Sequence, residues 1–289
     1  MKYNEVMNKR RKIVLASIAK NIENTFHLDY ATLLKAFSDF EIVKWIIIES
    51  NSTDNSHATL VEFSSKSSLI QFESLTSDFE DKILRTQVLA TARNRYLELV
   101  SELRQKSEVD YMVVYDLNNL NNKLRKDSID SCWDESNWGA VTANQAGPYY
   151  DIWALRHKFW NNVDCWESFQ AMQKIHGNSK LALWDSIYSK MIRIPYSNSW
   201  INVDSAFGGI AIYNTKYIEG CSYSGVNENG NQVCEHVAFN RGIQENKGDI
   251  YINPKMINFK YTDHSRRKLY YLISSIYLVI ANSVIRKPH

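Results

Sequence analysis

Short apolar runs alternate with amphipathic segments over roughly the first 120 residues of the chain. Mainly apolar runs of strand length occur at 12–16, 42–49 and 112–115, with a weaker one at 69–72. Apolar residues recur at helical spacing over 28–40 and 83–103. Because a short continuous apolar run is typical of a buried strand, the pattern predicts strand, helix, strand, helix, strand. That order indicates a parallel sheet with right-handed crossovers.

The pattern becomes less regular after residue 138. It predicts short strands at 138–144, 192–195, 201–203, 207–213 and 249–253. Helices are expected within 160–190 and over 233–242, and 220–231 is a loop rich in Gly, Asn and Ser. No internal repeat or low-complexity linker divides the sequence. We therefore expect one α/β domain over residues 1–265, with a mixed sheet flanked by helices.

The last segment of the chain, 266–289, has a different composition. Residues 269–285 include no charged side chain, and basic residues flank them at 266–268 and 286–287. The stretch is slightly short for a membrane-spanning helix and contains several polar residues. It predicts a C-terminal apolar helix. Three alternative roles follow for this helix: packing on the core, a homo-oligomer contact, or binding to a membrane surface with its basic ends against anionic lipid.

Composition bounds the class of protein. The 289 residues are 44% hydrophobic and 12% aromatic, which predicts a sizeable core and excludes a disordered chain. The formal charge of +2 gives no indication of a nucleic-acid partner. The four cysteines have no CxxC spacing, which is typical of scattered thiols in a reducing compartment. The first twelve residues contain no apolar signal-peptide core, so the expected location is the cytoplasm.

The run at 112–115 ends directly in Asp116, Leu117 and Asn118. In open α/β sheets, ligands bind beyond the carboxyl ends of the strands, so this triplet is expected at the rim of the sheet. Alternate residues of an extended segment face the same way, which places the Asp116 and Asn118 side chains together. Their oxygen atoms suit a divalent cation that bridges a diphosphate.

Two further strand ends are expected at the same edge, in the loops at 17–21 and 49–54. Polar side chains in these loops offer hydrogen bonds to a base or ribose, and the helix before the third strand carries an Arg with a planar fork for phosphate. Each of these residues alone also suits a cap, a turn or a surface charge. The candidate nucleotide-sugar residues are Ser17, Ile18, Asn21, Glu49, Asn51, Arg93, Asn94, Asp116, Leu117 and Asn118.

The order of these segments resembles the nucleotide-sugar domain of GT-A glycosyltransferases, which has a Rossmann-like fold. The resemblance lies in KIVLASIAKNIE, WIIIESNSTDNS, LATARNRYLEL and DYMVVYDLNN, and it covers roughly residues 12–254. In that fold a DxD motif holds a metal ion and the donor diphosphate. Asn118 here replaces the second acid with an uncharged amide, so the resemblance implies either a weakly held Mn²⁺ or Mg²⁺ or metal-independent transfer. The segment YYDIWALR is further similar to capsule-associated α-mannosyltransferases and to bacterial capsule and lipooligosaccharide transferases.

The resemblance also implies roles for later residues. A glycine turn at 207–209 followed by Glu235 and His236 fits the position of an acceptor-side base, with Glu235 as the base and His236 as its assistant. The structural alternative is a helix N-terminal Glu beside a partly buried His. His264 is a candidate third metal ligand beside Asp116 and Asn118. The candidate acceptor-binding residues are Trp138, Asn144, Tyr150, Asp151 and Trp153, although Trp153 also suits an aromatic core.

The sequence therefore predicts a cytoplasmic glycosyltransferase, peripheral at the inner face of the membrane if the C-terminal helix binds lipid. It would move a sugar from a UDP- or GDP-sugar to a glycan or lipid-linked glycan in bacterial surface polysaccharide synthesis, with retention or inversion left open. One alternative is a nucleotidyltransferase, against which the loop 17–21 lacks the glycine of a phosphate loop. The other is a catalytically degenerate sugar-nucleotide-binding or scaffold protein, indicated by the missing second acid at Asn118.

Overall fold

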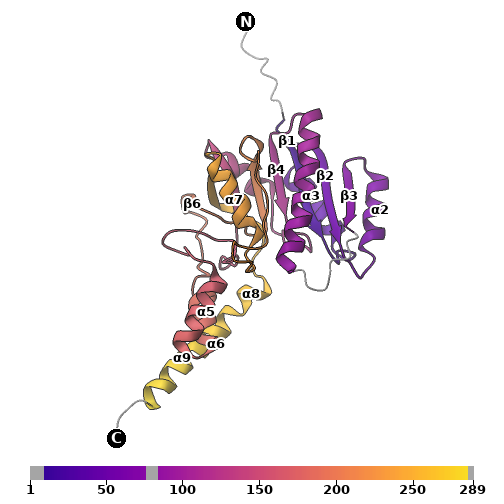
Figure 1. Cartoon of the computed structure of the whole chain (residues 1–289). Helices are drawn as coiled ribbons and strands as arrows, with labels where there is room; N and C mark the ends of the chain where they lie inside the picture. Colours follow the sequence, from indigo (N-terminus) through magenta and orange to yellow (C-terminus); the bar gives the residue numbers. More distant parts are fainter. Residues whose placement is uncertain (1–9, 76–83, 286–289) are drawn as a thin grey trace.

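A computed structural model describes residues 10–75 and 84–285 (Figure 1). The strands are β1 (Lys12–Ala19), β2 (Glu41–Ser50), β3 (Ile70–Leu75), β4 (Tyr111–Tyr115), β5 (Trp138–Asn144), β6 (Ile201–Val203), β7 (Ile210–Asn214) and β8 (Asp249–Ile257). The helices are α1 (Phe26–Ala36), α2 (Ser56–Lys66), α3 (Arg85–Lys106), α4 (Lys126–Asp130), α5 (Cys165–His176), α6 (Ser179–Leu183), α7 (Glu235–Glu245), α8 (Asp263–Arg266) and α9 (Lys268–Ile285). Short 3-10 or π turns occupy Ser131–Trp133, Trp184–Tyr188 and Thr215–Tyr217.

The eight strands form one mixed sheet in the order β3-β2-β1-β4-β7-β5-β8-β6. Strands β3, β2, β1 and β4 are parallel, as the alternating sequence pattern predicts. Strand β7 enters between β4 and β5 and is antiparallel to both, β5 and β8 are parallel, and β6 is an antiparallel edge. The expected α/β class, a mixed sheet flanked by helices, is confirmed.

The central strands of the sheet are buried on both faces, and alternate residues of β1, β2 and β4 enter two separate cores. Val14 and Val114 point into the core beneath α3 and α7, whereas Ile13 and Val113 point into the core beneath α1 and α4. A strand that is covered on both sides is continuously apolar, which explains why β1, β2 and β4 could be predicted from the sequence. The two layers of helices fix the sheet, and through it the carboxyl ends of the parallel strands.

The structure extends the first predicted strand and removes another predicted strand. The first strand extends beyond Ala16 to Ala19, because its register with β2 continues through Ser17 and Ile18. The predicted strand at 192–195 is wrong, since this segment contributes only an isolated bridge between Pro148 and Arg193. The first change matters for function because it moves the end of β1 three residues along the chain.

The C-terminal helix lies along α6, and Figure 1 shows α5, α6 and α9 extending together from one end of the sheet. The ring of Tyr271 on α9 stacks on Tyr188, with centroids 4.1 Å apart and planes at 14°. Across residues 10–75 and 84–285, no helix is long and apolar enough to cross a membrane.

Candidate active site

A cavity of about 640 Å³ opens at the carboxyl ends of β1, β2 and β4. Parallel strands end at the same edge, and the chain leaves each of these strands with a polar residue in its first turn. Asn51 and Asn118 take positive φ angles of 52° and 70°, which Asn tolerates better than most residues. The cavity is lined by Ile18, Ala19, Lys20, Ser50, Asn51, Arg85, Val88, Leu89, Ala92, Arg93, Asp116, Leu117, Asn118, Leu120, Tyr150, Asp151, Trp153, Phe207, Cys234, Glu235 and His236.

Arg93 joins the two candidate catalytic carboxylates at the centre of this cavity. Its Nε donates to Glu235 Oε1 at 2.9 Å, and its Nη2 lies 3.4 Å from Asp116 Oδ1. The side chain is only 4% exposed and lies over the ring of Phe207. Since both carboxylates hold the guanidinium inside the protein, Arg93 is placed to position these acids, and little of it is open to a donor phosphate.

Asp116 lies deep in the protein but keeps 29% of its side-chain surface open to the cavity. Burial raises its pKa from 3.8 to about 6, with Arg93 lowering it and Asp151 and Glu235 raising it further. Burial likewise raises the pKa of Asp151, against backbone hydrogen bonds from Gly208 and Ala154 that lower it. Acids packed near one another in a cleft are a feature of catalytic sites.

Two buried polar side chains that line the cavity have no hydrogen-bond partner among the described residues. They are Ser50, through its hydroxyl, and His236, through both ring nitrogens. The His236 ring stacks on Phe207 at 3.8 Å, and its Nε2 lies 3.8 Å from Glu235 Oε1. Burial, and next Arg93, hold the pKa of His236 well below its usual range, so the ring is neutral. Because buried polar groups are normally paired, these groups indicate a ligand in the cavity.

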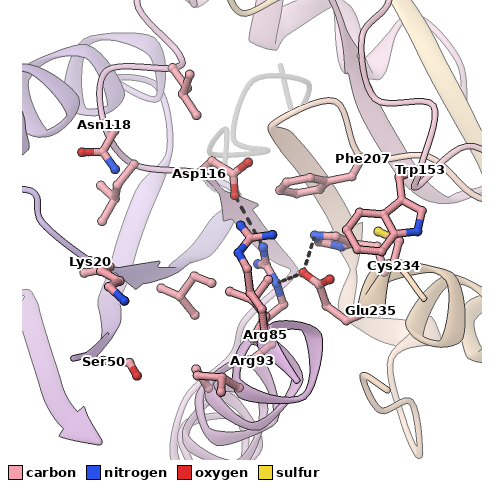
Figure 2. A pocket seen from close by; sticks show the side chains of 18 of the residues that line it. Lys20, Ser50, Arg85, Arg93, Asp116, Asn118, Trp153, Phe207, Cys234 and Glu235 are labelled. Carbon is pink, nitrogen blue, oxygen red and sulfur yellow. Dashed lines mark hydrogen bonds and ion pairs between the residues drawn. The ribbon is translucent and has the colours of Figure 1, made fainter. Parts of the chain in front are cut away.

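The two orphaned groups lie at opposite ends of the cavity. Figure 2 shows Lys20 and Ser50 on one side of Asp116, and Phe207, Trp153, Cys234 and Glu235 on the other. Lys20 and Arg85 are exposed, and neither has an ion-pair or hydrogen-bond partner within the part of the chain that the structure describes. In Figure 2, Lys20 lies on the first side and Arg85 lies beside Arg93 in the middle, so the cations occupy the first side and the centre, and the second side is aromatic and acidic.

The structure brings about half of the predicted donor residues to the cavity. The residues that line it are Ile18, Asn51, Arg93, Asp116, Leu117 and Asn118. The other four do not line it and make internal bonds: Ser17 to Tyr115, Asn21 to Thr53, Glu49 to Ser52, and Asn94 to Tyr223. In the structure these four side chains hold neighbouring loops or the helix α3 in place and do not line the cavity.

The predicted acceptor residues divide in the same way. Tyr150, Asp151 and Trp153 line the cavity, and Asp151 accepts from the backbone N–H of Gly208 at 2.9 Å. Trp138 is 3% exposed and packs between Tyr111 and Trp133 in the core.

Asn144 is fully buried and donates to the carbonyls of Ile194 and Pro254. Trp138 and Asn144 are therefore structural, and the expectation that they contact an acceptor is corrected.

Lys20, Ser50 and Arg85 line the cavity, and the sequence prediction omits them. The signal for Lys20 was available, because it is the one basic residue in the loop expected after the first strand. Ser50 is the last residue of β2, and Arg85 is the first residue of α3. Both would follow from treating strand and helix ends, and not only loops, as candidate positions.

The proposed metal ligands do not assemble into a site by themselves. Asp116 faces the Arg93 guanidinium, and Asn118 Oδ1 accepts from Thr25 Oγ1 at 3.3 Å. His264 is exposed on α8 and does not line the cavity. No group of three or more His, Cys, Asp or Glu in residues 10–75 and 84–285 is arranged to hold a metal ion. A Mg²⁺ or Mn²⁺ ion in such enzymes is usually held by one or two side-chain oxygens together with substrate phosphates and water, so Asp116 and Asn118 would hold a cation only together with a bound diphosphate.

No family model matches the chain, and no curated protein matches it. Among solved structures, it is similar to residues 1–349 of TarS from S. aureus, with 13% identity and a TM-score of 0.46 over 94% of this chain and 66% of that one. It is also similar to glucosyl-3-phosphoglycerate synthase from Mycobacterium tuberculosis in complex with Mn²⁺, UDP and phosphoglyceric acid, with 12% identity and a TM-score of 0.43 over 92% and 78%. A third is mannosyltransferase PcManGT from Pyrobaculum calidifontis in complex with GDP-Man and Mn²⁺, with 11% identity and a TM-score of 0.46 over 97% and 66%.

Proposed function

We propose that this chain is a glycosyltransferase that moves a sugar from a UDP- or GDP-sugar to a hydroxyl group of a glycan or lipid-linked glycan. The observation that carries the proposal is the division of one cavity into two chemically different sides around Asp116 (Figure 2). One part of it offers cations that pair with no other described residue, and the other side offers carboxylates and aromatic rings. A nucleoside diphosphate needs the first kind of surface, and a sugar with several hydroxyls needs the second.

The donor diphosphate is assigned to the cationic side. Lys20 follows the last residue of β1, and Arg85 opens the 22-residue helix α3, whose N-terminal turns line the cavity. A helix N-terminus and two basic side chains together favour an anion. The leaving diphosphate gains negative charge as the glycosidic bond breaks, and fixed cations at that position stabilise the transition state. Ser50 and Asn51 supply hydrogen bonds beside them.

The acceptor is assigned to the acidic side. Glu235 is the proposed general base, because its carboxylate lines the cavity while Arg93 holds Oε1 in place. The neutral His236 beside it is buried, and its ring nitrogens bond to no other described residue. Trp153 and Tyr150 offer ring faces to the sugars, and Asp151 is held by Gly208. A base in this position inverts the anomeric configuration, which NMR of the product reads directly.

A role in bacterial surface polysaccharide synthesis is proposed on the resemblance of the segment at 149–156 to capsule and lipooligosaccharide transferases. The cytoplasm is proposed as the location because all four cysteines are free thiols. Three of them are buried in the protein.

The function is tested with a panel of UDP-, GDP- and CMP-sugars, each assayed for thermal stabilisation and for turnover. A bound donor raises the unfolding temperature by mass action, so the correct nucleotide is expected to stand out before the acceptor is known. Release of the free nucleoside diphosphate from the same donor reports transfer or hydrolysis. Binding without turnover on any acceptor would favour the scaffold alternative, and release of pyrophosphate from a nucleoside triphosphate would favour a nucleotidyltransferase.

Lys20→Ala and Arg85→Ala are each expected to weaken binding of the free nucleoside diphosphate about tenfold to a hundredfold, as removal of one charge-assisted hydrogen bond predicts. The effect should shrink at high salt, since both side chains are exposed. Isothermal titration measures it. Lys35→Ala, an exposed lysine on α1 outside the cavity, is the matched control. Unchanged affinity in both cavity variants would contradict the assignment of the diphosphate.

Asn118→Asp tests the donor set at the end of β4. A second acid beside Asp116 adds an anionic ligand, so Mn²⁺ affinity in the presence of UDP is expected to rise at least about tenfold. Asp tolerates the positive φ of this position nearly as well as Asn. Asn51→Asp, which adds the same charge at another positive-φ residue of the cavity, is the control. An equal gain in both variants would show that net charge, and not this position, sets the affinity.

A further inference from the structure

The helix α9 exposes a row of apolar side chains. Leu269, Tyr270, Ile273, Ile276 and Tyr277 are each more than half exposed. Their spacing of i, i+1, i+4, i+7 and i+8 places them on one face of the helix, which is named here the α9 outer face. Isolated exposed apolar residues are ordinary, but a contiguous row of five on one helix marks an interaction surface.

The opposite face of α9 is anchored to the protein. Tyr271 stacks on Tyr188, Ser275 is buried, and Lys268 Nζ donates to the carbonyl of Met191 at 2.6 Å. Figure 1 shows the helix alongside α6, in the extension that leaves one end of the sheet. These contacts of the opposite face fix the orientation of α9, so its outer face is exposed although the helix is packed against the protein.

Basic residues flank the α9 outer face. From residue 264 to 289 the sequence holds five Lys or Arg residues and no Asp or Glu, with three basic residues before the apolar stretch and two after it. Arg266 makes a long, exposed ion pair with Asp263 at 3.8 Å. On the neighbouring α6, Lys180 places its Nζ 5.3 Å from the ring centroid of Tyr270.

We propose that the α9 outer face binds the surface of an anionic lipid bilayer, with the helix lying parallel to it. Apolar and Tyr side chains enter the boundary between headgroups and acyl chains, and flanking cations meet the lipid phosphates. A second copy of the chain fits this face less well. Both ends of the apolar stretch are basic, so parallel and antiparallel pairing of two α9 helices would each bring like charges together.

This surface lies outside the cavity, so the proposal stands whether or not the chain transfers a sugar. It is tested by flotation of the full chain with vesicles of phosphatidylcholine alone and with vesicles that also contain phosphatidylglycerol. The wild-type chain is expected to float with the anionic vesicles and to stay at the bottom with the neutral ones. High salt should reduce the floating fraction, because the basic residues at the surface are screened.

Two variants separate the contributions. Ile273→Gln combined with Ile276→Gln keeps the charge and is expected to lower the partition coefficient at least about tenfold. Arg266→Gln combined with Arg267→Gln is expected to lower it about thirtyfold on anionic vesicles. Val61→Gln, an exposed apolar residue on α2, is the control and should float like the wild type. Circular dichroism and thermal unfolding confirm that each variant is folded, and nucleotide binding should be unchanged in all of them.

Three results would overturn the proposal. The first is that the wild-type chain fails to float with anionic vesicles, and the second is that it floats equally well with neutral ones. The third is that the variant with Gln at positions 273 and 276 floats as well as the wild type. Sedimentation of the wild type as a dimer that this variant abolishes, without flotation, would assign the α9 outer face to a second copy instead.

Discussion

Asp116→Asn is expected to reduce sugar transfer by about a hundredfold to a thousandfold while the chain stays folded, because it removes the carboxylate that would hold a divalent cation against the donor diphosphate. Asp116 is the carboxylate at the end of β4, between the cationic and acidic sides of the cavity. Asn keeps the size of the side chain but removes its charge. The local backbone is held independently, because the N–H of Asp116 donates to Gly209 at 2.9 Å and its carbonyl accepts from Asn121.

The same substitution is expected to change stability in the opposite direction. The pKa of Asp116 is raised from 3.8 to about 6, so the native state holds this proton more tightly than the unfolded state does. The contribution of protonated Asp116 to the free energy of unfolding is therefore fully present below about pH 4. It is lost as the pH rises to about 6, which lowers the free energy of unfolding by roughly 3 kcal/mol. Asn does not titrate, so the variant should lack this fall and unfold at a higher temperature than the wild type at pH 7.

Both effects are measured on one preparation. Turnover is followed at saturating donor, and thermal unfolding is recorded from pH 4 to pH 8. Asp130→Asn removes an exposed carboxylate that pairs with Lys126 on α4, and it should leave turnover unchanged and stability within about 0.5 kcal/mol. Full activity in Asp116→Asn would reject the proposed site, and an unchanged pH dependence of stability would show that the native pKa of Asp116 is ordinary.

The half of the sheet that carries β1, β2 and β4 could be predicted from the sequence because these strands are buried on both faces. Such strands are continuously apolar, and their local periodicity contains the information that defines them. The position of β7 between β4 and β5 could not be predicted in this way. It depends on pairing between Tyr115 and Ile210, residues far apart in the chain, and no local pattern encodes that choice of partner.

The location of the candidate site could be predicted from the sequence better than the side chains that line it. Parallel topology brings the ends of β1, β2 and β4 together, so Asn51 and Asp116 follow from strand order. Which polar residue at such an end turns toward the cavity depends on tertiary partners. Asn94 and Arg93 are neighbours on α3, yet the first bonds to Tyr223 behind the cavity and the second holds Glu235.

Arg93→Met is expected to destabilise the chain by about 3–5 kcal/mol, as removal of one partner from a buried charge cluster does. The substitution keeps the apolar contacts of the side chain but leaves Glu235 and Asp116 without their common cation. Arg95→Met, two residues along the same helix, removes a half-buried pair with Glu73 at 2.7 Å and should cost about 1 kcal/mol or less. A chemical denaturation series on the two variants gives the comparison directly.

The pH dependence of that loss identifies its cause. Arg93 lowers the pKa of Asp116, so without it that pKa should rise further above its unfolded value, and Glu235 loses its buried cation. The penalty should therefore be small at low pH, where Asp116 is neutral, and grow as the pH rises. Glu235→Gln in the Arg93→Met background removes one of the two uncompensated charges and should restore part of the stability at pH 7, which a double-mutant cycle quantifies. A loss of equal size at pH 5 and pH 8, with no recovery in the double variant, would mean that Arg93 acts through packing on Phe207 and Tyr223 and not as the charge that holds the two acids.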